Sequence, residues 1–426
     1  MRLAGGLVTA CAVLALLLAN VGPAFAGHVS CGDVITQDTT LDSDLTDCPL
    51  NGVVIRTDGV RLDLNGHTID GGVPYLDPFS PFADRGIAIA AEGVTIQNGS
   101  VYGFAEGITA GAPAGTPVVI RGITVGCNRV ECPQSTDMIG ITVSGSGGNV
   151  QIEDSTVVNT PNGILLFGSH NHVENSRFHG NVVAARVLGF DNVIRSNRIT
   201  GSSFTGIQLF GDLAQVNLVE LNAVRGGQTG IAVSREASRN TVRRNDVRNA
   251  AMGIRSDEES DENLISANHV ANASHTGIGV EFTRDDEVMG NIVRHSNHGI
   301  RLIGATGVTM VGNRVLRSTA NGVALIGLNQ VGSTRNLVVD NLVRRSALDG
   351  IFVNQFMVDT TVERNTASRN GDDGIDVDST QTTITRNHAD HNRDLGIEAV
   401  EGVTDGGGNR ARRNGNPLRC TGVVCR

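Results

Sequence analysis

The sequence contains no tryptophan and no lysine, and aromatic residues make up only 3% of its 426 residues. A globular enzyme of this length normally fills its core with large rings, so this core must consist of small aliphatic side chains. The absence of lysine excludes every mechanism that uses lysine as the general base. What is abundant is glycine, with 54 residues, together with recurring Val, Ile and Leu, which favour strands.

The chain has an excess of acidic residues. It contains 34 Lys plus Arg, all of them Arg, against 44 Asp plus Glu, which gives a formal net charge of −10. Removal of an N-terminal signal would take away only Arg2 and leave 33 − 44 = −11. Such a charge is unfavourable for sequence-independent binding to phosphate backbones, so we expect no nucleic-acid partner.

The N-terminal segment is typical of a secretory signal peptide. Arg2 precedes the apolar run Leu3–Leu18, and residues 24–26 read Ala-Phe-Ala, an A-x-A cleavage site. A membrane anchor is the alternative, but the apolar run is short for a bilayer span. We therefore predict a signal peptide at residues 1–26 that is cleaved after Ala26, and a secreted mature chain without a membrane span.

Seven cysteines are present, and Cys11 would leave with the signal, so six remain. An even number in an exported chain indicates disulfides. A zinc site is the alternative, but no second C-x-x-C or nearby histidine completes four ligands. The cysteines form three pairs that are close in the sequence, and we predict these pairs to be disulfides: Cys31–Cys48, Cys127–Cys132 and Cys420–Cys425.

Two short motifs recur along the chain. The first is Gly-Ile or Gly-Val, and from Gly206 onward its successive steps are 24, 23, 24, 22, 23, 28, 24 and 22 residues. A gap of 43 residues between Gly163 and Gly206 indicates one degenerate coil around residues 182–183. The second motif is hydrophobic-x-x-Asn-x-hydrophobic, which is clear from Asn197 onward and for which Asn414 is the last expected member. Two motifs in fixed phase indicate one coil of a solenoid. The glycines of the first motif are Gly86, Gly107, Gly140, Gly163, Gly206, Gly230, Gly253, Gly277, Gly299, Gly322, Gly350, Gly374 and Gly396.

The residue types decide which solenoid this is. Gly-Ile-x-Val segments are short, rich in β-branched residues and bounded by turn formers, which predicts strands and excludes helical solenoids. Leucine-rich repeats have a similar period, but no L-x-x-L-x-L register is present. We therefore predict an all-β, single-stranded right-handed parallel β-helix of about 14 coils of 22–24 residues. The recurring asparagines are expected to stack as a structural ladder.

A stacked solenoid needs closed ends, because exposed strand edges invite aggregation. We assign residues 27–60 to an N-terminal cap and first strands, residues 61–414 to the β-helix and residues 415–426 to a C-terminal disulfide cap. Residues 72–85 and the segment between Cys127 and Cys132 interrupt the early repeats, which predicts loops. We expect the protein to be a monomer.

These motifs resemble the right-handed parallel β-helix proteins of the pectin-lyase-like class, and the repeat is similar to that of the NosD-like branch of carbohydrate-binding and sugar-hydrolase proteins. The run from Leu62 to Gly71, LDLNGHTIDG, is similar to the first rung of such proteins. The resemblance covers nearly all of the mature chain and implies the fold. It does not single out a function, because this fold carries lyases, hydrolases, epimerases and proteins without catalysis.

The outward positions of the Gly-Ile strands are where chemistry is expected, because alternate side chains of a strand point to opposite faces. Three successive coils contribute Arg255, Asp257, Glu281 and Arg301, and Gly279 between the two arginines leaves an open slot. Arginine forks bind carboxylates well, so a uronate sugar is expected in the slot, with Asp257 or Glu281 as acid or base. The alternative is a surface ladder of salt bridges.

The same outward columns carry further candidates for substrate binding. Gln208 and Phe210 lie two coils before Arg255, and together with Arg255 and Arg301 they form the predicted substrate-binding set. The four residues of the middle cluster form the predicted catalytic set.

The last coils carry an acidic cluster without a basic partner: Asp372, Asp373, Asp376, Asp378 and Glu398. Asp376 and Glu398 should be lateral neighbours at ~5 Å. Three interpretations stay open at this point. Asp376, Asp378 and Glu398 are candidate ligands of Ca²⁺, the carboxyl spacing also suits a retaining glycosidase, and a solvated acidic face is the third alternative. No cofactor is required by any other feature.

Individual catalytic motifs of the β-helix enzymes are incomplete. Gly371-Asp372-Asp373 resembles the Gly-Asp-Asp of polygalacturonases, but the pair His298-Gly299 comes before it rather than after it. Their Arg-Ile-Lys element is impossible without lysine, and the Asp-Pro-His signature of alginate epimerases is absent. Lyases that use arginine as the base remain compatible, with Arg255 or Arg301 as the candidate. The histidines form no compact ligand set for copper.

Two functional hypotheses follow. The first is a secreted protein that binds an acidic polysaccharide and modifies it as a lyase, hydrolase or epimerase. The alternative is a non-catalytic extracellular rod with a structural or adhesive role. Whether the protein is an enzyme is left open by the sequence.

Overall fold

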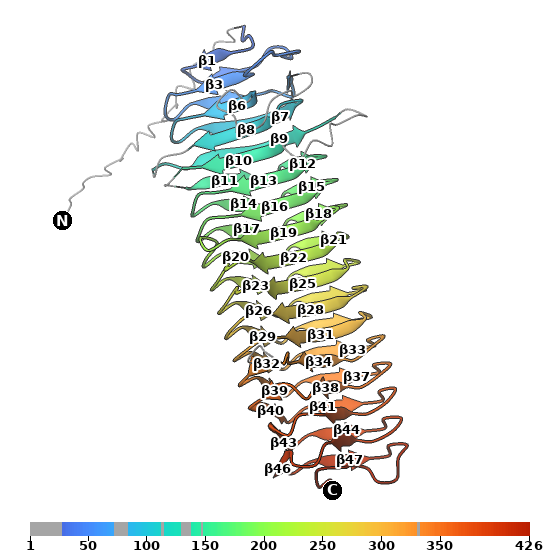
Figure 1. Cartoon of the computed structure of the whole chain (residues 1–426). Coiled ribbons are helices and arrows are strands. Elements are labelled where there is room, and N and C mark those ends of the chain that lie inside the picture. The colour runs from blue at the N-terminus through green and yellow to red at the C-terminus, as the bar shows by residue number, and fades with distance from the viewer. Residues whose placement is uncertain (1–27, 72–83, 112–114, 129–137, 146–147, 330–332) are drawn as a thin grey trace, which may run out of the picture.

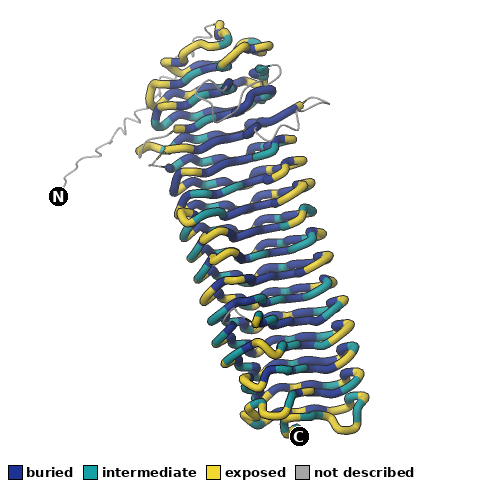
Figure 2. The backbone as a smooth tube through the Cα atoms, viewed as in Figure 1, coloured by how far each residue is buried: buried dark blue, intermediate teal, exposed yellow. Residues whose placement is uncertain are grey.

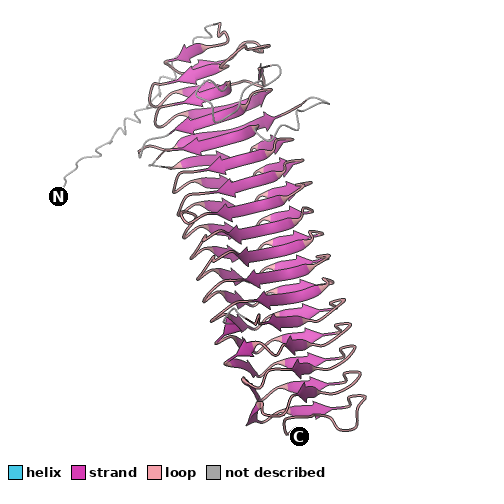
Figure 3. Ribbon diagram, viewed as in Figure 1, coloured by secondary structure: helices cyan, strands magenta, loops and turns pink. Residues whose placement is uncertain are grey.

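The computed structural model describes residues 28–71, 84–111, 115–128, 138–145, 148–329 and 333–426. The backbone winds into a long rod of stacked coils that begins with β1 at one end and finishes with β47 at the other (Figure 1). The regular elements of these residues are strands (Figure 3), and none of the described segments is a helix long and apolar enough to cross a membrane. The predicted signal peptide with its cleavage site after Ala26, and nearly all of the loop 72–85, lie outside the described residues.

Each coil contributes one strand to a parallel sheet of 16 strands, here called sheet A. Equivalent motif positions lie side by side, so that Ile254 pairs with Ile278 and Ile278 with Ile300. The all-β solenoid is confirmed, with two coils ahead of the first Gly-Ile motif. The strands of sheet A are β1 (Asp33–Ile35), β3 (Val53–Ile55), β6 (Arg85–Ile89), β8 (Glu106–Gly111), β10 (Ile139–Ser144), β13 (Asn162–Leu166), β16 (Val183–Val187), β19 (Thr205–Phe210), β22 (Thr229–Ser234), β25 (Met252–Asp257), β28 (Thr276–Glu281), β31 (His298–Ile303), β34 (Val323–Ile326), β38 (Ile351–Val353), β42 (Ile375–Val377) and β45 (Ile397–Ala399).

The rest of each coil forms two further parallel ladders of short strands, here called ladders B1 and B2, and the long strands β7 (Thr95–Tyr102) and β9 (Val118–Gly126) run through both. Ladder B1 also contains β2 (Thr39–Thr40), β4 (Arg61–Asp63), β11 (Val150–Glu153), β14 (His172–Glu174), β17 (Val193–Arg195), β20 (Leu218–Glu220), β23 (Thr241–Arg243), β26 (Leu264–Ser266), β29 (Glu287–Met289), β32 (Thr309–Val311), β36 (Leu337–Val339), β40 (Thr360–Glu363), β43 (Thr382–Thr385) and β46 (Thr404–Gly407).

Ladder B2 contains the second short strand of each coil: β5 (Thr68–Asp70), β12 (Thr156–Val158), β15 (Arg177–His179), β18 (Arg198–Thr200), β21 (Ala223–Arg225), β24 (Asp246–Arg248), β27 (His269–Ala271), β30 (Ile292–Arg294), β33 (Arg314–Leu316), β37 (Leu342–Arg344), β41 (Thr366–Ser368), β44 (His388–Asp390) and β47 (Arg410–Arg412). A separate two-stranded sheet joins β35 (Ser333–Thr334) to β39 (Met357–Val358).

The core is a continuous column of aliphatic side chains inside the coils. Buried residues recur along successive coils (Figure 2). Ile254, Ile278 and Ile300 are completely buried, as are Val247, at the equivalent inward place of ladder B2, and Val242 of ladder B1. Each such side chain stabilises the fold by roughly 1.5–3 kcal/mol relative to exposure. The coils therefore fill their interior without large rings, as the composition predicts.

The asparagine ladder is confirmed as a structural feature. Asn245 Nδ2 donates to Asn268 Oδ1 at 3.0 Å, and Asn268 Nδ2 donates both to Asn291 Oδ1 at 3.0 Å and to the carbonyl oxygen of Val242 at 2.8 Å. Each amide thus satisfies backbone groups that the bend between ladders B1 and B2 would leave unpaired. The prediction that Asn414 is the last member of this ladder is wrong. Asn387 donates from its backbone N and from Nδ2 to Asn409 Oδ1, so the ladder ends at Asn409.

Asn414 belongs to another ladder, which the sequence motif did not reveal, formed by Asn370, Asn392 and Asn414 at the corner before sheet A. A further ladder lies at the corner before ladder B1, where Asn240 Nδ2 donates to Asn263 Oδ1 at 3.2 Å. Its members are Asn171, Asn192, Asn217, Asn240 and Asn263.

Disulfides lie at both ends of the rod. Cys31–Cys48 joins residues of the first coils, and Cys420–Cys425 joins residues of the C-terminal segment, so both of these predicted pairings are confirmed. The last segment also pairs with the final coils, through bridges of Ile397 with Cys420 and of Asn409 with Cys425. Cys132 falls outside the described residues, so its pairing with Cys127 stays a prediction.

Candidate functional site

The outer face of sheet A brings together the residues of the middle cluster, as the repeat predicts. Arg255 pairs with Gly279 and Gly279 with Arg301 in the parallel register, and Asp257 pairs with Glu281. The four side chains therefore lie on three consecutive strands, β25, β28 and β31.

These four side chains form ion pairs with one another. Arg255 Nη2 lies 2.7 Å from Asp257 Oδ2 and 2.9 Å from Glu281 Oε2. Arg301 Nη2 lies 3.1 Å from Glu281 Oε1, so Glu281 bridges the two arginines. The space above Gly279 is flanked by the Glu281 carboxylate, with Oε1 3.6 Å from the place of a Cβ atom. A uronate would therefore have to compete with protein carboxylates for both guanidinium groups.

Burial shifts the pKa of two groups at the middle cluster, Asp257 and His298. Asp257 and Glu281 are buried, and desolvation raises the pKa of Asp257 from 3.8 to about 6 although Arg255 opposes the shift. Desolvation also lowers the pKa of His298, which lies beside Arg301, and the positive charge of Arg301 adds to this shift. The cluster thus contains a carboxyl with a raised pKa near an imidazole with a lowered pKa, and the catalytic roles of its four members stay predictions.

The predicted binding residues Gln208 and Phe210 lie next to an arginine that the sequence motif did not reveal. Arg186 pairs with Gln208 across β16 and β19, donates from Nε to Gln208 Oε1 at 2.9 Å, and places its guanidinium 5.6 Å from the centre of the Phe210 ring. Arg235 lies over the same ring at 5.1 Å. Arg186 was missed because its coil has no Gly-Ile motif, although the gap between Gly163 and Gly206 marks that coil.

The acidic cluster of the last coils is confirmed as a lateral arrangement, because Asp376 on β42 pairs with Glu398 on β45. Burial, together with the nearby charge of Asp349, raises the pKa of Asp376 from 3.8 to about 7. Burial and a hydrogen bond with Glu398 hold the pKa of Asp373 well above its usual range. Among the described residues, no arginine or histidine forms an ion pair with these carboxyls.

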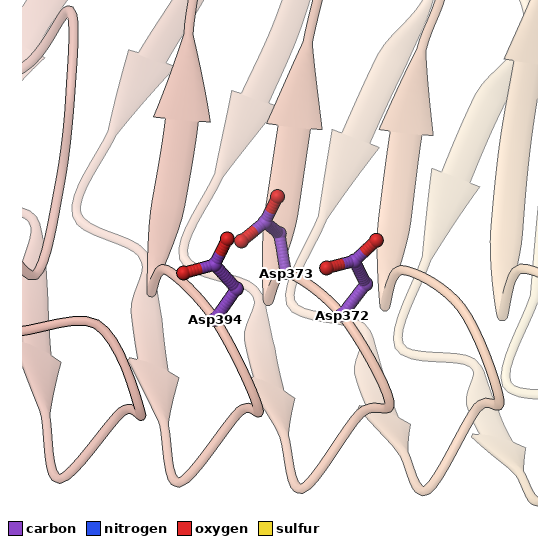
Figure 4. Close-up of side chains that lie close together, drawn as sticks. All are labelled: Asp372, Asp373 and Asp394. Atoms are coloured by element: carbon purple, nitrogen blue, oxygen red, sulfur yellow. The ribbon is translucent and has the colours of Figure 1, made fainter.

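A set of three carboxyls suited to a cation lies at the turn before β42 (Figure 4). Ligand oxygens of Asp372, Asp373 and Asp394 all lie within 4.8 Å of one another. Asp373 is also held by the backbone, since its Oδ1 accepts from Leu395 N at 2.6 Å. This set differs from the predicted one of Asp376, Asp378 and Glu398, and Asp394 is the member that the sequence did not suggest, because it belongs to the next coil.

The geometry defines the class of the protein as a parallel β-helix with a polar face along sheet A. The chain belongs to the family described as right-handed β-helix region, whose sequence model matches residues 162–315 and 279–416. No curated protein matches the sequence.

Several solved structures share the fold at low identity. The catalytic unit of a GH87 α-1,3-glucanase from Streptomyces thermodiastaticus strain HF3-3 is 16% identical with a TM-score of 0.55, over 83% of this chain and 64% of the glucanase chain. The Dettilon tailspike protein is 14% identical with a TM-score of 0.44, over 71% of this chain and 60% of the tailspike. The periplasmic alginate epimerase AlgG is 15% identical with a TM-score of 0.42, over 84% of this chain and 78% of the epimerase. This chain thus spans less than two thirds of the tailspike and of the glucanase unit, and the likeness concerns the fold.

Proposed function

We propose that this protein is a secreted carbohydrate-active β-helix that binds an acidic polysaccharide along the outer face of sheet A and cleaves its glycosidic bonds with the acidic cluster. The observation that carries the proposal is the pair Asp376 and Glu398, which lie on neighbouring strands, beside Asp373, without an arginine partner among the described residues. Glycoside hydrolysis uses two neighbouring carboxyls, one of which donates a proton, and burial raises the pKa of Asp376 to about 7.

Each carboxyl of the cluster has a chemical role in this proposal. Asp376, whose pKa is raised to about 7, donates the proton to the leaving oxygen as general acid. Glu398 is exposed on the neighbouring strand and serves as the nucleophile or base. Asp373 hydrogen-bonds to Glu398 and orients its carboxylate, so Asp373 is a positioning residue.

The binding track explains why the substrate is a polymer rather than a small sugar. Arg186 on β16 and Asp376 on β42 are eight strand spacings apart in sheet A, which corresponds to about 38 Å. A uronate carboxylate would bind at Arg186, while the face of a sugar ring would pack on the neighbouring Phe210 ring. The predicted binders Gln208, Arg255 and Arg301 lie along the same track, between its two ends.

The direct test is to incubate the mature protein with pectate, alginate, glycosaminoglycans and a neutral glucan, and to measure new reducing ends. We expect cleavage of one acidic polymer, with a rate that falls as the pH rises through 7 because Asp376 loses its proton. Asp376→Asn and Glu398→Gln should each lower kcat at least 100-fold. Glu401→Gln, an exposed change beyond β45, serves as the control and should leave the rate unchanged.

The outcomes separate the hypotheses. Unsaturated products would show that the reaction is that of a lyase and not hydrolysis, with Arg255 or Arg301 as the candidate base. Binding in an affinity gel without any product would support the non-catalytic adhesive rod. Neither binding nor product with any polymer in the panel would contradict the whole proposal.

We also propose that Ca²⁺ binds at the end of the acidic cluster, with Asp372, Asp373 and Asp394 as ligands in preference to the set around Asp376 and Asp378. The ion would join two consecutive coils. Addition of Ca²⁺ should raise the melting temperature by a few degrees, and Asp394→Asn should abolish the increase. A melting temperature that is the same with Ca²⁺ and with a chelator would show that the carboxyls hold no calcium.

A further inference from the structure

A groove of about 290 Å³ lies on ladder B2 and the turn that follows it, away from the carboxyls described above. Apart from His295 and two leucines, Leu316 and Leu342, its lining consists of arginines. Five of the six arginines are exposed and the sixth, Arg344, is half-buried. The arginines of the groove are Arg294, Arg314, Arg317, Arg344, Arg345 and Arg369.

The repeat itself gathers these arginines. In ladder B2, Arg294 pairs with Leu316, and Leu316 pairs with Arg344, so charged and apolar side chains alternate from coil to coil. Arg317, Arg345 and Arg369 each follow the strand of their own coil and stack at one corner, where the Arg345 amide donates to Ser368 O and the Arg317 amide to Arg344 O. The result is one corner row with an arginine on each of three successive coils, at ~4.8 Å, beside strand columns in which arginine recurs at every second coil.

The corner row uses a backbone conformation that arginine seldom adopts. Arg317, Arg345 and Arg369 all have φ of 60°, whereas the same corner of earlier coils holds Asn249 and Asn272, residues that tolerate this region well. Arginine suits this backbone conformation less well than asparagine, and at these three corners it places a positive charge on the surface.

None of the six arginines forms an ion pair with a carboxylate in the described part of the chain. Arg344 donates from Nε to Ser368 Oγ at 2.9 Å, and Arg317 contacts His295. The opposite situation is found at the corner between ladders B1 and B2, where Arg364 pairs with Asp340 and Arg386 with Glu363. A chain with a net charge of −10 thus concentrates unpaired positive charge in one groove, which stabilises an external anion there.

We propose that this groove binds the acidic groups of an anionic polysaccharide, as a site separate from sheet A and independent of the cleavage proposed there. The arginine forks bind carboxylate or sulfate groups in a bidentate manner, and Leu316 and Leu342 offer an apolar floor for sugar rings. The groove extends from the coil of Arg294 to that of Arg369, which is three strand spacings or about 14 Å. This length is greater than the diameter of a single small anion.

Nucleic acid fits the groove less well, because the lining contains no Phe, Tyr or Trp on which bases could stack.

The experiment measures binding of Arg345→Gln/Arg369→Gln to a sulfated glycosaminoglycan and to a polyuronate, with a neutral dextran as the uncharged polymer. Each polymer is offered by affinity gel and by titration calorimetry over a range of salt. Kd for one acidic polymer should rise at least tenfold, and the slope of log K against log salt should fall by about 2. The matched control is Arg364→Gln/Arg386→Gln, which changes two exposed arginines at similar φ that already have carboxylate partners, and it should bind as wild type does.

Three results would overturn the inference: unchanged affinity of Arg345→Gln/Arg369→Gln, an oligonucleotide that binds the groove more tightly than every polysaccharide, or sedimentation showing that the arginines hold the acidic face of a second copy. The two proposals fail separately. Glu398→Gln should retain binding in the groove, whereas Arg345→Gln/Arg369→Gln should still cleave short oligosaccharides that do not reach it. Equal melting temperatures of both arginine variants and wild type show that each variant is folded.

Discussion

Asp286 occupies a place where neighbouring coils carry asparagine. It follows Asn240 and Asn263 in the ladder before ladder B1, is completely buried, and accepts from Asn263 N through Oδ1 at 2.7 Å. The amides of Asn240 and Asn263 donate to the carbonyl oxygens of Ala214 and Ala237, whereas Ser260 O, the equivalent oxygen for position 286, accepts from Asn263 Nδ2 at 2.8 Å. A carboxylate cannot donate to that oxygen. Burial accordingly raises the pKa of Asp286 from 3.8 to about 7.

Asp286→Asn should therefore stabilise the protein in a pH-dependent manner. Because the pKa of Asp286 is higher in the folded state than in the unfolded state, wild type loses stability as the pH rises from about 4 to about 7 and not further above. The gain of the variant should be close to zero at pH 4 and reach at most about 4 kcal/mol at pH 8. Denaturant unfolding at both pH values measures it, with the exposed neighbour Asp285→Asn as the control that should show no such difference. An equal gain at both pH values would mean that charge is not the cause.

At the scale of the element, the bends rather than the strands carry the most specific polar contacts. Asn268 accepts from the backbone N and from Nδ2 of Asn245, and donates to Asn291 Oδ1 and to Val242 O. The spacing of these asparagines in the sequence was enough to predict their ladder, because stacking of identical coils requires the same residue at each bend. The other ladders escaped prediction because Asp286 and Val308 interrupt the one before ladder B1, and the one before sheet A is short.

Asn268→Ala should lower the free energy of unfolding by on the order of 3 kcal/mol, since it leaves several buried polar groups without partners. Asn297→Ala is a suitable comparison, because the Asn297 side chain makes one exposed hydrogen bond to Thr319 Oγ1 at 3.2 Å. It should cost less than about 1 kcal/mol. Equal losses in the two variants, measured by denaturant unfolding, would contradict a special role of the ladder.

At the scale of the whole molecule, the last coils carry opposite charges on different parts of their circumference. Ladder B2 and the corner after it present arginines such as Arg345 and Arg369, whereas the strands of sheet A and the turns before them present Asp376 and Glu398. Disulfides at Cys31–Cys48 and Cys420–Cys425 lie at the two ends, where a coil has no neighbour on one side. In the two functions that we propose, an acidic polymer binds in the arginine groove on one side of the rod and is cleaved at the acidic cluster on another.

The sequence by itself determined the parallel coil, its aliphatic core, the asparagine ladder between ladders B1 and B2 and the lateral pairing of Asp376 with Glu398. It could do so because a coil of nearly constant length places equal motif positions at equal heights, so that register follows from counting. Only the tertiary structure decided that Glu281 forms ion pairs with both Arg255 and Arg301, and that the arginines of ladder B2 share one groove. Those contacts depend on side-chain reach across coils and around corners, and the period of the repeat carries no information about either.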